Sequence, residues 1–182
     1  MQNFTNILKK EIFPISLILI LAFSRLIPHP PNFTPIIAVA IMSGYLFKNI
    51  YLSFAILLTS MILADSFIGF YNDMLFVYLS LFLIAYIFYK MSRKINLKNL
   101  FLYSLFGSLV FFAISNFGVW ASGSLGVYDI PYEKNLKGLM ECYILAIPFF
   151  KNTLLSTLFF TYGAFLVNVF YLKVFLKKNK LA

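Results

Sequence analysis

The sequence predicts an all-α integral membrane protein, a bundle of six transmembrane helices. Of its 182 residues, 62% are hydrophobic and only 12% are charged, whereas a soluble domain carries about 25% charged residues. The basic residues stand between long apolar runs, as charges that flank a membrane do, so the net charge of +9 indicates no nucleic-acid partner. We therefore expect the lipid bilayer as solvent and one domain over residues 1–182.

Six apolar segments approach the length of about 20 residues that a helix needs to cross the hydrocarbon core. They are residues 12–27, 34–47, 50–70, 74–89, 100–122 and 154–176. The second segment is short, because its residues at a rise of 1.5 Å cover only about 21 Å. Its length leaves open whether it crosses the membrane or re-enters it, and the distribution of charge decides between these alternatives.

Six spans divide the fifteen basic residues eleven to four between the two sides. The side with eleven holds Lys9, Lys10, Lys48, Lys90, Arg93, Lys94, Lys98, Lys173, Lys177, Lys178 and Lys180. The positive-inside rule then places both termini and the loop 90–99 in the cytoplasm, with the bacterial inner (plasma) membrane as the expected location. A second segment that did not span would put Lys9 and Lys10 outside, so six spans are favoured. The first span is expected to be retained, because Arg25 and a proline-rich turn follow it where a signal peptide would have its cleavage site.

The three outer connections are chemically richer than the short basic inner ones. The first reads RLIPHPPNFTP and is stiffened by its prolines, with Thr34 suited to cap the second span. The third is expected to be the longest, over residues 123–152. Its apolar part, Leu139 to Phe150, is expected to lie on the outer face or to dip into it, and Asn152 and Thr153 are expected to open the last span in an N-cap role.

Two charged residues lie within or at the end of apolar spans. Arg25 is at the outer end of the first span and Asp65 lies near the outer end of the third. A charge at mid-membrane costs roughly 2.5 to 3.5 kcal/mol, so each of these residues is expected to have a partner or a function that offsets this cost. Their similar depth allows an ion pair, which would serve either a ligand or a structural clamp between helices, and Arg25 could instead extend alone to the headgroups.

Further polar and aromatic residues complete a candidate binding site at the outer face. Asn116 and Trp120 share one face of the fifth span, where the indole would stack on a ligand or anchor the helix at the interface. Tyrosines of the third outer connection would form a lid. The full candidate set is Arg25, Asn32, Asp65, Asn116, Trp120, Tyr128, Tyr143 and Asn152.

Metal and catalytic signals are weak in this sequence. His29 is the lone histidine and Cys142 the lone cysteine, whereas a metal site normally has three or four ligands. We therefore expect no metal and no cofactor. Because the sequence has no phosphate-binding glycine loop and no nucleophile beside a base, we expect neither an enzyme nor an ATP-driven motor in this chain.

Several blocks together resemble the DUF6580 family of uncharacterised small membrane proteins. These blocks are RLIPHPPNFTPIIAVAIMSGYLF, NFGVW and GLMECYILAIPFFKNTL, with Asp65 between them. The resemblance covers Arg25 to Asn168 and implies no established activity. One departure is Ser156-Thr157, where the family is expected to favour Gly-Asp, and this argues against an acidic role on the sixth span.

The size and the six-span layout are similar to those of the substrate-binding S components of energy-coupling-factor transporters. Those proteins bind a vitamin or a metal ion near the outer face, and a separate ATPase complex powers its release. The AxxxA pattern by which many S components dock that partner is missing from ISLILILAFSR in the first span. This chain would then need another docking surface or would work alone.

The leading functional hypothesis is capture of a small molecule, vitamin-like or metal-like, at an outward-facing site, with transport as its extension. Its partners would be the bilayer, that small molecule, and separate membrane or ATPase subunits. The alternative is a structural or assembly subunit of a cell-envelope complex without a ligand of its own. Polar residues around an open cavity would favour capture, and polar residues packed against one another would favour the structural alternative.

Overall fold

The computed structural model describes the backbone of residues 2–179 and the side chains of residues 11–92 and 94–174. The described chain is all-α. Its helices are α1 (Gln2–Phe23), η1 (Ser24–Leu26), α2 (Ile36–Leu46), α3 (Ile50–Ile68), α4 (Met74–Met91), η2 (Ser92–Lys94), α5 (Leu100–Ser122) and α6 (Leu136–Asn179), where η marks a single 3₁₀ turn.

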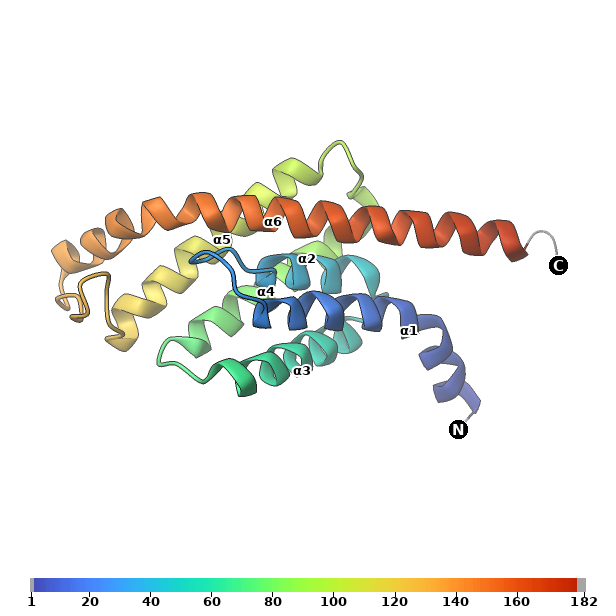
Figure 1. The fold of residues 1–182 in the computed structure, drawn as a ribbon, viewed down its shortest axis with the longest axis horizontal. Coiled ribbons are helices and arrows are strands. Elements are labelled where there is room, and N and C mark those ends of the chain that lie inside the picture. Colours follow the sequence, from blue (N-terminus) through green and yellow to red (C-terminus); the bar gives the residue numbers. More distant parts are fainter. Residues whose placement is uncertain (1, 180–182) are drawn as a thin grey trace.

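Successive α-helices alternate in direction along the long axis of the molecule (Figure 1). The connections 24–35, 69–73 and 123–135 therefore lie together at one end, which we call the loop end. The start of α1 and the end of α6 lie at the opposite end, the terminal end, with the connections 47–49 and 92–99. The first two outer connections expected from the sequence, and the first part of the third, are thus at the loop end.

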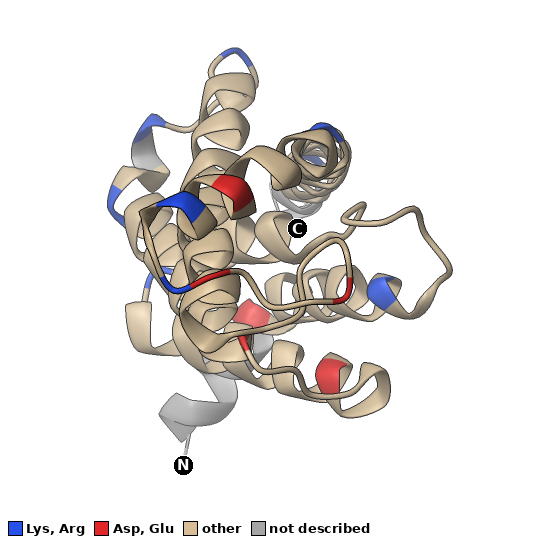
Figure 2. Cartoon of the chain, turned by 90° about the vertical axis from the view of Figure 1, so that its left-hand side faces the viewer, with Lys and Arg blue, Asp and Glu red and all other residues tan. Residues whose placement is uncertain are grey.

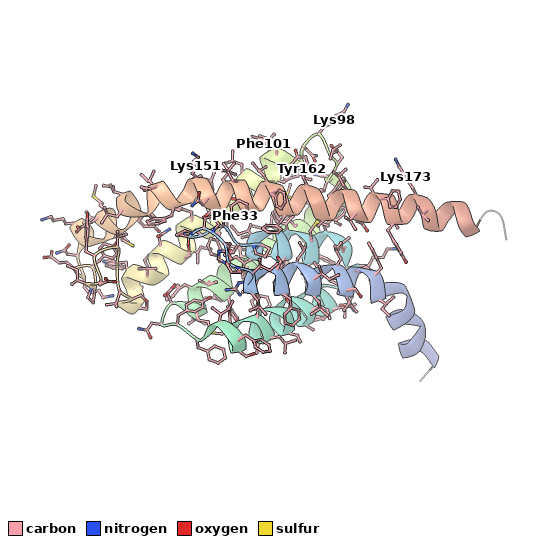
Figure 3. All side chains as sticks on the ribbon, viewed as in Figure 1. Phe33, Lys98, Phe101, Lys151, Tyr162 and Lys173 are labelled. Atoms are coloured by element: carbon pink, nitrogen blue, oxygen red, sulfur yellow. The ribbon has the colours of Figure 1, made fainter. Side chains whose placement is uncertain are left out.

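Four of the described helices are long and apolar enough to cross a membrane: α3, α4, α5 and the part of α6 up to Val174. Large apolar side chains project outward around the bundle, and Phe67, Phe159 and Phe170 are each about two-thirds exposed or more (Figure 3). Water would be a poor solvent for so continuous an apolar surface. This distribution is the one expected for helices in lipid.

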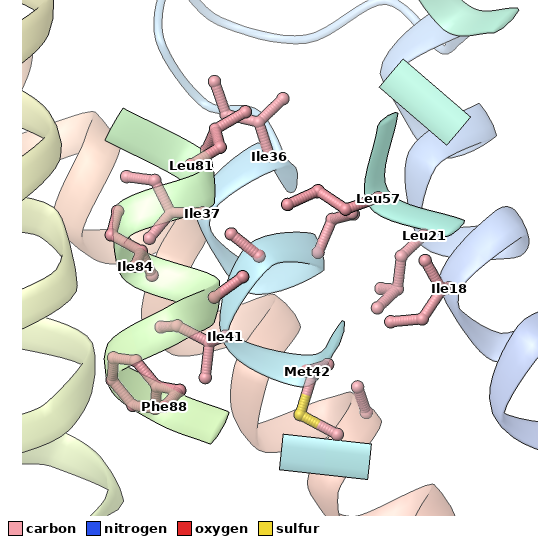
Figure 4. Close-up of a cluster of buried hydrophobic side chains, with 14 of the residues drawn as sticks. Ile18, Leu21, Ile36, Ile37, Ile41, Met42, Leu57, Leu81, Ile84 and Phe88 are labelled. Carbon is pink, nitrogen blue, oxygen red and sulfur yellow. The ribbon is translucent and has the colours of Figure 1, made fainter. Parts of the chain in front are cut away.

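The short helix α2 forms the centre of the bundle. All residues from Ile36 to Gly44 are buried, because α1, α3, α4, α5 and α6 surround the helix. Figure 4 shows Ile37 and Ile41 of α2 beside Ile84 and Phe88 of α4, with Leu57 of α3 on the other side. A helix that is apolar all round is stable only where neighbouring helices enclose it, and here they do.

The closest helix packing is between α2 and α4. A Cβ atom added to Gly44 would lie 2.2 Å from the carbonyl oxygen of Ala85, so only glycine allows the two backbones this close. Small residues at helix contacts are typical of bundles in lipid, where close van der Waals packing stabilises association. Gly44 therefore fixes the position of α2 against α4.

Charge is distributed unevenly between the two ends. Figure 2 faces the loop end, near which the acidic residues concentrate. These are Asp65, Asp73, Asp129, Glu133 and Glu141, whereas Glu11 is in the first half of α1, toward the terminal end. The basic turn between α4 and α5 also lies at the terminal end.

The predicted outer loop 123–152 is wrong beyond residue 135. From Leu136 the chain is helical and continues through Pro148 as α6, 44 residues in all. The expected N-cap at Asn152 is therefore absent, because this residue lies inside the helix. The physical reason is the spacing of apolar residues: Met140, Ile144 and Ile147 form an exposed stripe at helical spacing, opposite buried Cys142.

Helix α2 also begins one position later than predicted. Pro35, not Thr34, is the residue before its first helical residue, and no side chain caps the helix. By contrast, the Asn49 side chain caps α3 and accepts hydrogen bonds from the backbone N–H groups of Tyr51 and Leu52. Helix α2 thus begins directly after its proline-rich connection, without a polar side chain that caps it.

Candidate functional site

A cavity of about 270 Å³ opens at the loop end, above the first turn of α2. Helices α4, α5 and α6 and the connection 24–35 form its walls. Both polar and aromatic side chains line these walls. The lining residues are Arg25, Asn32, Thr34, Ile36, Ile37, Tyr71, Asp73, Val77, Phe111, Phe112, Ser115, Asn116, Val119, Ala146, Phe150 and Thr153.

The proline-rich connection between η1 and α2 forms the side of the cavity nearest the loop end. Asn32 has a backbone φ of 59°, a left-handed conformation that asparagine adopts more readily than most residues. The Asn152 side chain amide of α6 donates a hydrogen bond to the carbonyl oxygen of Pro31, with 2.9 Å between the atoms. This bond fixes the connection to α6 and keeps Asn32 at the cavity.

The predicted pair of Arg25 and Asp65 forms. Arg25 Nη1 lies 2.8 Å from Asp65 Oδ1, and the two side chains are 9% and 0% exposed. The other carboxylate oxygen of Asp65 accepts a hydrogen bond of 2.6 Å from the Tyr78 hydroxyl of α4. The pair thus joins η1, α3 and α4 just below the cavity, and Asp65 itself has no accessible surface.

Tyr71 lies beside this pair, in the connection between α3 and α4, and lines the cavity. Burial raises the pKa of Tyr71 well above its usual range, the negative charge of Asp65 raises it further, and the nearby Arg25 guanidinium opposes part of this rise. The phenol therefore stays protonated and uncharged, and it offers a hydroxyl donor to the cavity.

Asp73 is the carboxylate that reaches the cavity wall. One of its oxygens accepts a hydrogen bond of 2.9 Å from the Ser124 hydroxyl. Ser124 follows Gly123, which ends α5 in a left-handed conformation with φ 72°. The sharp turn after α5 therefore brings a hydroxyl group to the start of α4 and orients the Asp73 carboxylate.

The α5 wall presents one amide to the cavity. Asn116 donates from Nδ2 to the carbonyl oxygen of Phe112, one helical turn earlier, at 2.8 Å. Its Oδ1 accepts no hydrogen bond within the described part of the chain. Ser115 and Thr153, by contrast, donate to carbonyl groups of their own helices. Of these three residues, Asn116 is therefore the one that keeps an unused acceptor for a ligand.

Aromatic rings form the apolar part of the cavity. Phe112 of α5 contacts Phe150 of α6 edge to face, with 5.2 Å between ring centroids, and Tyr143 at 5.8 Å. Phe111 lines the cavity beside them. These rings give a ligand both apolar contact and the negative faces of π systems.

The eight predicted binding residues divide into two groups. Arg25, Asn32 and Asn116 line the cavity, and Asp65 lies beneath Arg25. The other four, among them Asn152, do not line it. The Tyr143 hydroxyl donates to the carbonyl oxygen of Ala113, and Tyr128 projects outward from the connection 123–135.

Trp120 fastens the connection between α5 and α6. Its Nε1 donates a hydrogen bond of 2.9 Å to the carbonyl oxygen of Glu133, and the Lys134 amine lies 5.4 Å from the indole ring. The same amine donates to the carbonyl oxygen of Trp120. This part of the expected lid is therefore held to the end of α5.

The two weak metal candidates lie in separate surroundings. His29 is exposed and contacts the carbonyl oxygen of Pro30, while Cys142 is buried and donates to the carbonyl oxygen of Asn116 at 3.4 Å. Among the residues that the structure describes, no three His, Cys, Asp or Glu side chains are grouped closely enough to hold a metal ion.

Sequence reasoning missed several cavity residues, chiefly Tyr71, Asp73 and the phenylalanines. One signal was present on α5: Phe112, Asn116 and Val119 lie at helical spacing, so a polar Asn116 directed inward implies that its neighbours on that face are also directed inward. Tyr71 and Asp73 lie in a five-residue connection whose sequence carried no comparable signal.

Comparison with known proteins identifies a family but no relative of established activity. The searches of curated proteins and of solved structures found no match. Residues 5–180 match the family described as "Family of unknown function (DUF6580)", which covers almost the whole chain and includes every residue of the cavity. The chain therefore belongs to the DUF6580 family.

Proposed function

We propose that this protein captures a small molecule in the cavity at its loop end. The observation that supports this most directly is the cavity itself, where Asn116 and Asp73 each keep an oxygen without a hydrogen bond in the described part of the chain, beside aromatic walls. Ligand pockets are typically concave and apolar with a few placed polar groups, and their volumes are about 300–1,000 Å³. A cavity of about 270 Å³ fits a small ligand.

We further propose that the loop end faces outward and that all six α-helices span the membrane. The eleven-to-four division of basic residues supports this orientation through the positive-inside rule. Helix α2 is shorter than a bilayer is thick, but its enclosure by the other helices removes the need to contact lipid along its length. Both termini would then be cytoplasmic, in a bacterial inner membrane.

Transport is the extension of this proposal. An outward cavity in a six-span bundle is similar to the arrangement in S components, whose release step requires separate ATPase subunits. That similarity is one of layout, which is weak support for mechanism. Detection of stable membrane or ATPase partners after gentle solubilisation would support transport, and a protein that purifies alone would favour capture only.

The proposal is tested by native mass spectrometry of protein solubilised with its lipids, with a variant that fills the cavity. Ala146→Trp places an indole in the cavity, whereas Ala121→Trp adds the same group at an exposed position of α5. A co-purified small molecule should be present in the wild type and in Ala121→Trp and absent from Ala146→Trp. The same molecule at equal occupancy in both variants would contradict capture in this cavity.

A structural or assembly function is the second candidate, and one observation favours it. Asp65 bonds to both Arg25 and Tyr78 and so joins three elements, as expected for a clamp between helices. Under this alternative the wild-type protein would carry no small molecule and would purify in a larger complex. If variants that disrupt the clamp lost that complex, and no ligand was found at any stage, the structural function would replace capture as the conclusion.

A further inference from the structure

We propose that the ligand of the cavity is a small organic cation and that Asp73 is its counter-ion. This inference rests on the capture function proposed above and names the chemical class of its ligand. Three independent features support it: the pairing of the charges beneath the cavity, the surroundings of Asp73, and the aromatic walls.

The charge of Arg25 is already balanced within the protein. Its Nη1 is 2.8 Å from Asp65, a carboxylate with no accessible surface, so the two charges cancel at the base of the cavity. An anionic ligand that approached Arg25 would also approach Asp65, and the repulsion would offset much of the attraction. Although Arg25 Nε is buried without a hydrogen-bond partner among the described residues, Arg25 is therefore a weaker site for an anion than its charge alone suggests.

The charge of Asp73 is not balanced in this way. No Lys, Arg or His side chain lies within salt-bridge distance of it among those that the structure describes, where the Arg25–Asp65 pair is the ion pair observed. Ser124 holds one carboxylate oxygen, and the other accepts no hydrogen bond in the same part of the chain. Arg25, Asp65 and Asp73 together leave one negative charge at the cavity.

The remaining walls suit a cation as well. Phe111, Phe112 and Phe150 present aromatic rings, and a cation close to the face of such a ring is attracted to it. The free Oδ1 of Asn116 is a further acceptor for an ammonium hydrogen. A ligand with an ammonium group near Asp73 and an apolar body against the rings would use all of these groups.

Three probes of similar size and different charge test this inference: 2-phenylethylammonium, 2-phenylethanol and phenylacetate. Saturation-transfer NMR on the full-length protein in detergent, at low ionic strength, measures the dissociation constant of each. We expect the ammonium to bind most tightly. Asp73→Asn keeps the acceptor oxygen for Ser124 and removes the charge, and it should weaken ammonium binding by about tenfold, as loss of a hydrogen bond to a charged group does.

Asp129→Asn is the matched control, because Asp129 is an exposed carboxylate of the same end that does not line the cavity. It should leave the affinity for the ammonium unchanged. An equal loss in both variants would assign the preference to the general negative field of the loop end and would overturn the role of Asp73. Circular dichroism and thermal unfolding of both variants establish that each is folded.

The remaining outcomes separate this inference from the proposed function. Tightest binding by phenylacetate or by the alcohol would overturn the cationic ligand class while leaving capture in the cavity intact. If none of the probes bound, the cationic ligand class would also be overturned. Capture would then be tested by the co-purified molecule in the Ala146→Trp comparison alone. A co-purified molecule that carries a net negative charge would contradict the inference directly.

Discussion

Breaking the Arg25–Asp65 pair should destabilise the bundle strongly, and breaking both partners together should cost less than the sum. The relevant variants are Arg25→Met, Asp65→Asn and the double variant, with Tyr78→Phe as a third probe of the same carboxylate. Methionine keeps the apolar stem of arginine, and asparagine keeps the acceptor oxygen for Tyr78. Each single change therefore removes mainly a charge.

The magnitude follows from distance and burial. At 2.8 Å and an effective dielectric constant of about 20, the gross attraction is about 6 kcal/mol, most of which offsets the cost of removing both charges from water. In Arg25→Met, Asp65 stays fully buried with only the Tyr78 hydroxyl as partner, so we expect a loss of about 3–5 kcal/mol. For Tyr78→Phe we expect about 1.5–3 kcal/mol, because the lost hydrogen bond is to a charged group.

The assay is thermal unfolding in one detergent at one protein concentration, followed by tryptophan and tyrosine fluorescence. For a chain of this size a loss of 1 kcal/mol lowers Tm by about 2–4 °C, so Arg25→Met should lower it by about 6–20 °C. The double variant should recover part of that loss, with a coupling of about 0.5–3 kcal/mol. Lys151→Met on the exposed side of α6 is the control and should change stability by less than about 0.5 kcal/mol.

Strict additivity would refute this reasoning. If the double variant lost as much as the two single variants combined, the two side chains would contribute independently and the clamp would be absent. Nearly normal stability of both single variants would show that water reaches the pair, and a ligand-binding role for Arg25 would then be favoured.

Three further predictions concern the orientation, the core and the connection between α5 and α6. In a Cys142-free background, a cysteine at Lys98 should react only with reagent added from the cytoplasmic side and one at Tyr128 only from outside; labelling of both from one side would exclude six spans. Gly44→Ala should destabilise by about 1–3 kcal/mol because its Cβ would overlap a carbonyl oxygen of α4, whereas Gly163→Ala, with open space around it, should be neutral or stabilising. Trp120→Phe removes the indole hydrogen bond and should increase hydrogen exchange in the connection 123–135, and an unchanged exchange rate would show that other contacts hold it.

The Arg25–Asp65 contact could be predicted because charge inside an apolar run is costly. Two such charges at similar depth satisfy each other, so their positions in sequence were enough to suggest a contact between residues forty positions apart. The third partner, Tyr78, could not be found in this way. The chain has twelve tyrosines, and the hydroxyls of others, such as Tyr89 and Tyr143, donate to backbone carbonyl oxygens instead, so residue type alone does not identify the partner of Asp65.

The course of α6 was mispredicted because Pro148 and Lys151 together resemble the end of one element and the start of another. Proline inside a helix removes one backbone hydrogen bond, yet helices in lipid tolerate it when neighbouring groups satisfy the carbonyl oxygens that are released. The apolar spacing on both sides of Pro148 keeps the helical period. That period was the stronger signal, and it favours one continuous helix.

The cavity could not be predicted, because no single segment contains it. Its polar groups come from two connections, from η1 and from α5 and α6, and two of its four hydroxyl groups bond to carbonyl oxygens of their own helices. Its aromatic residues do not stand out in a chain with 23 phenylalanines. Only the packing of the helices shows which phenylalanines face inward.

The position of the cavity follows from the shortness of α2. Eleven residues at a rise of 1.5 Å per residue extend about 16 Å, while α4 and α5 extend about 27 and 34 Å around it. At the terminal end Gly44 lets α2 pack tightly against α4, so the missing length falls at the loop end. The stiff connection with Pro30 and Pro31 passes beside that space without filling it, and the connection 69–73, α5 and α6 leave polar and aromatic side chains at its walls. Helix α2 is shorter than a typical membrane span, and this same shortness creates the candidate site.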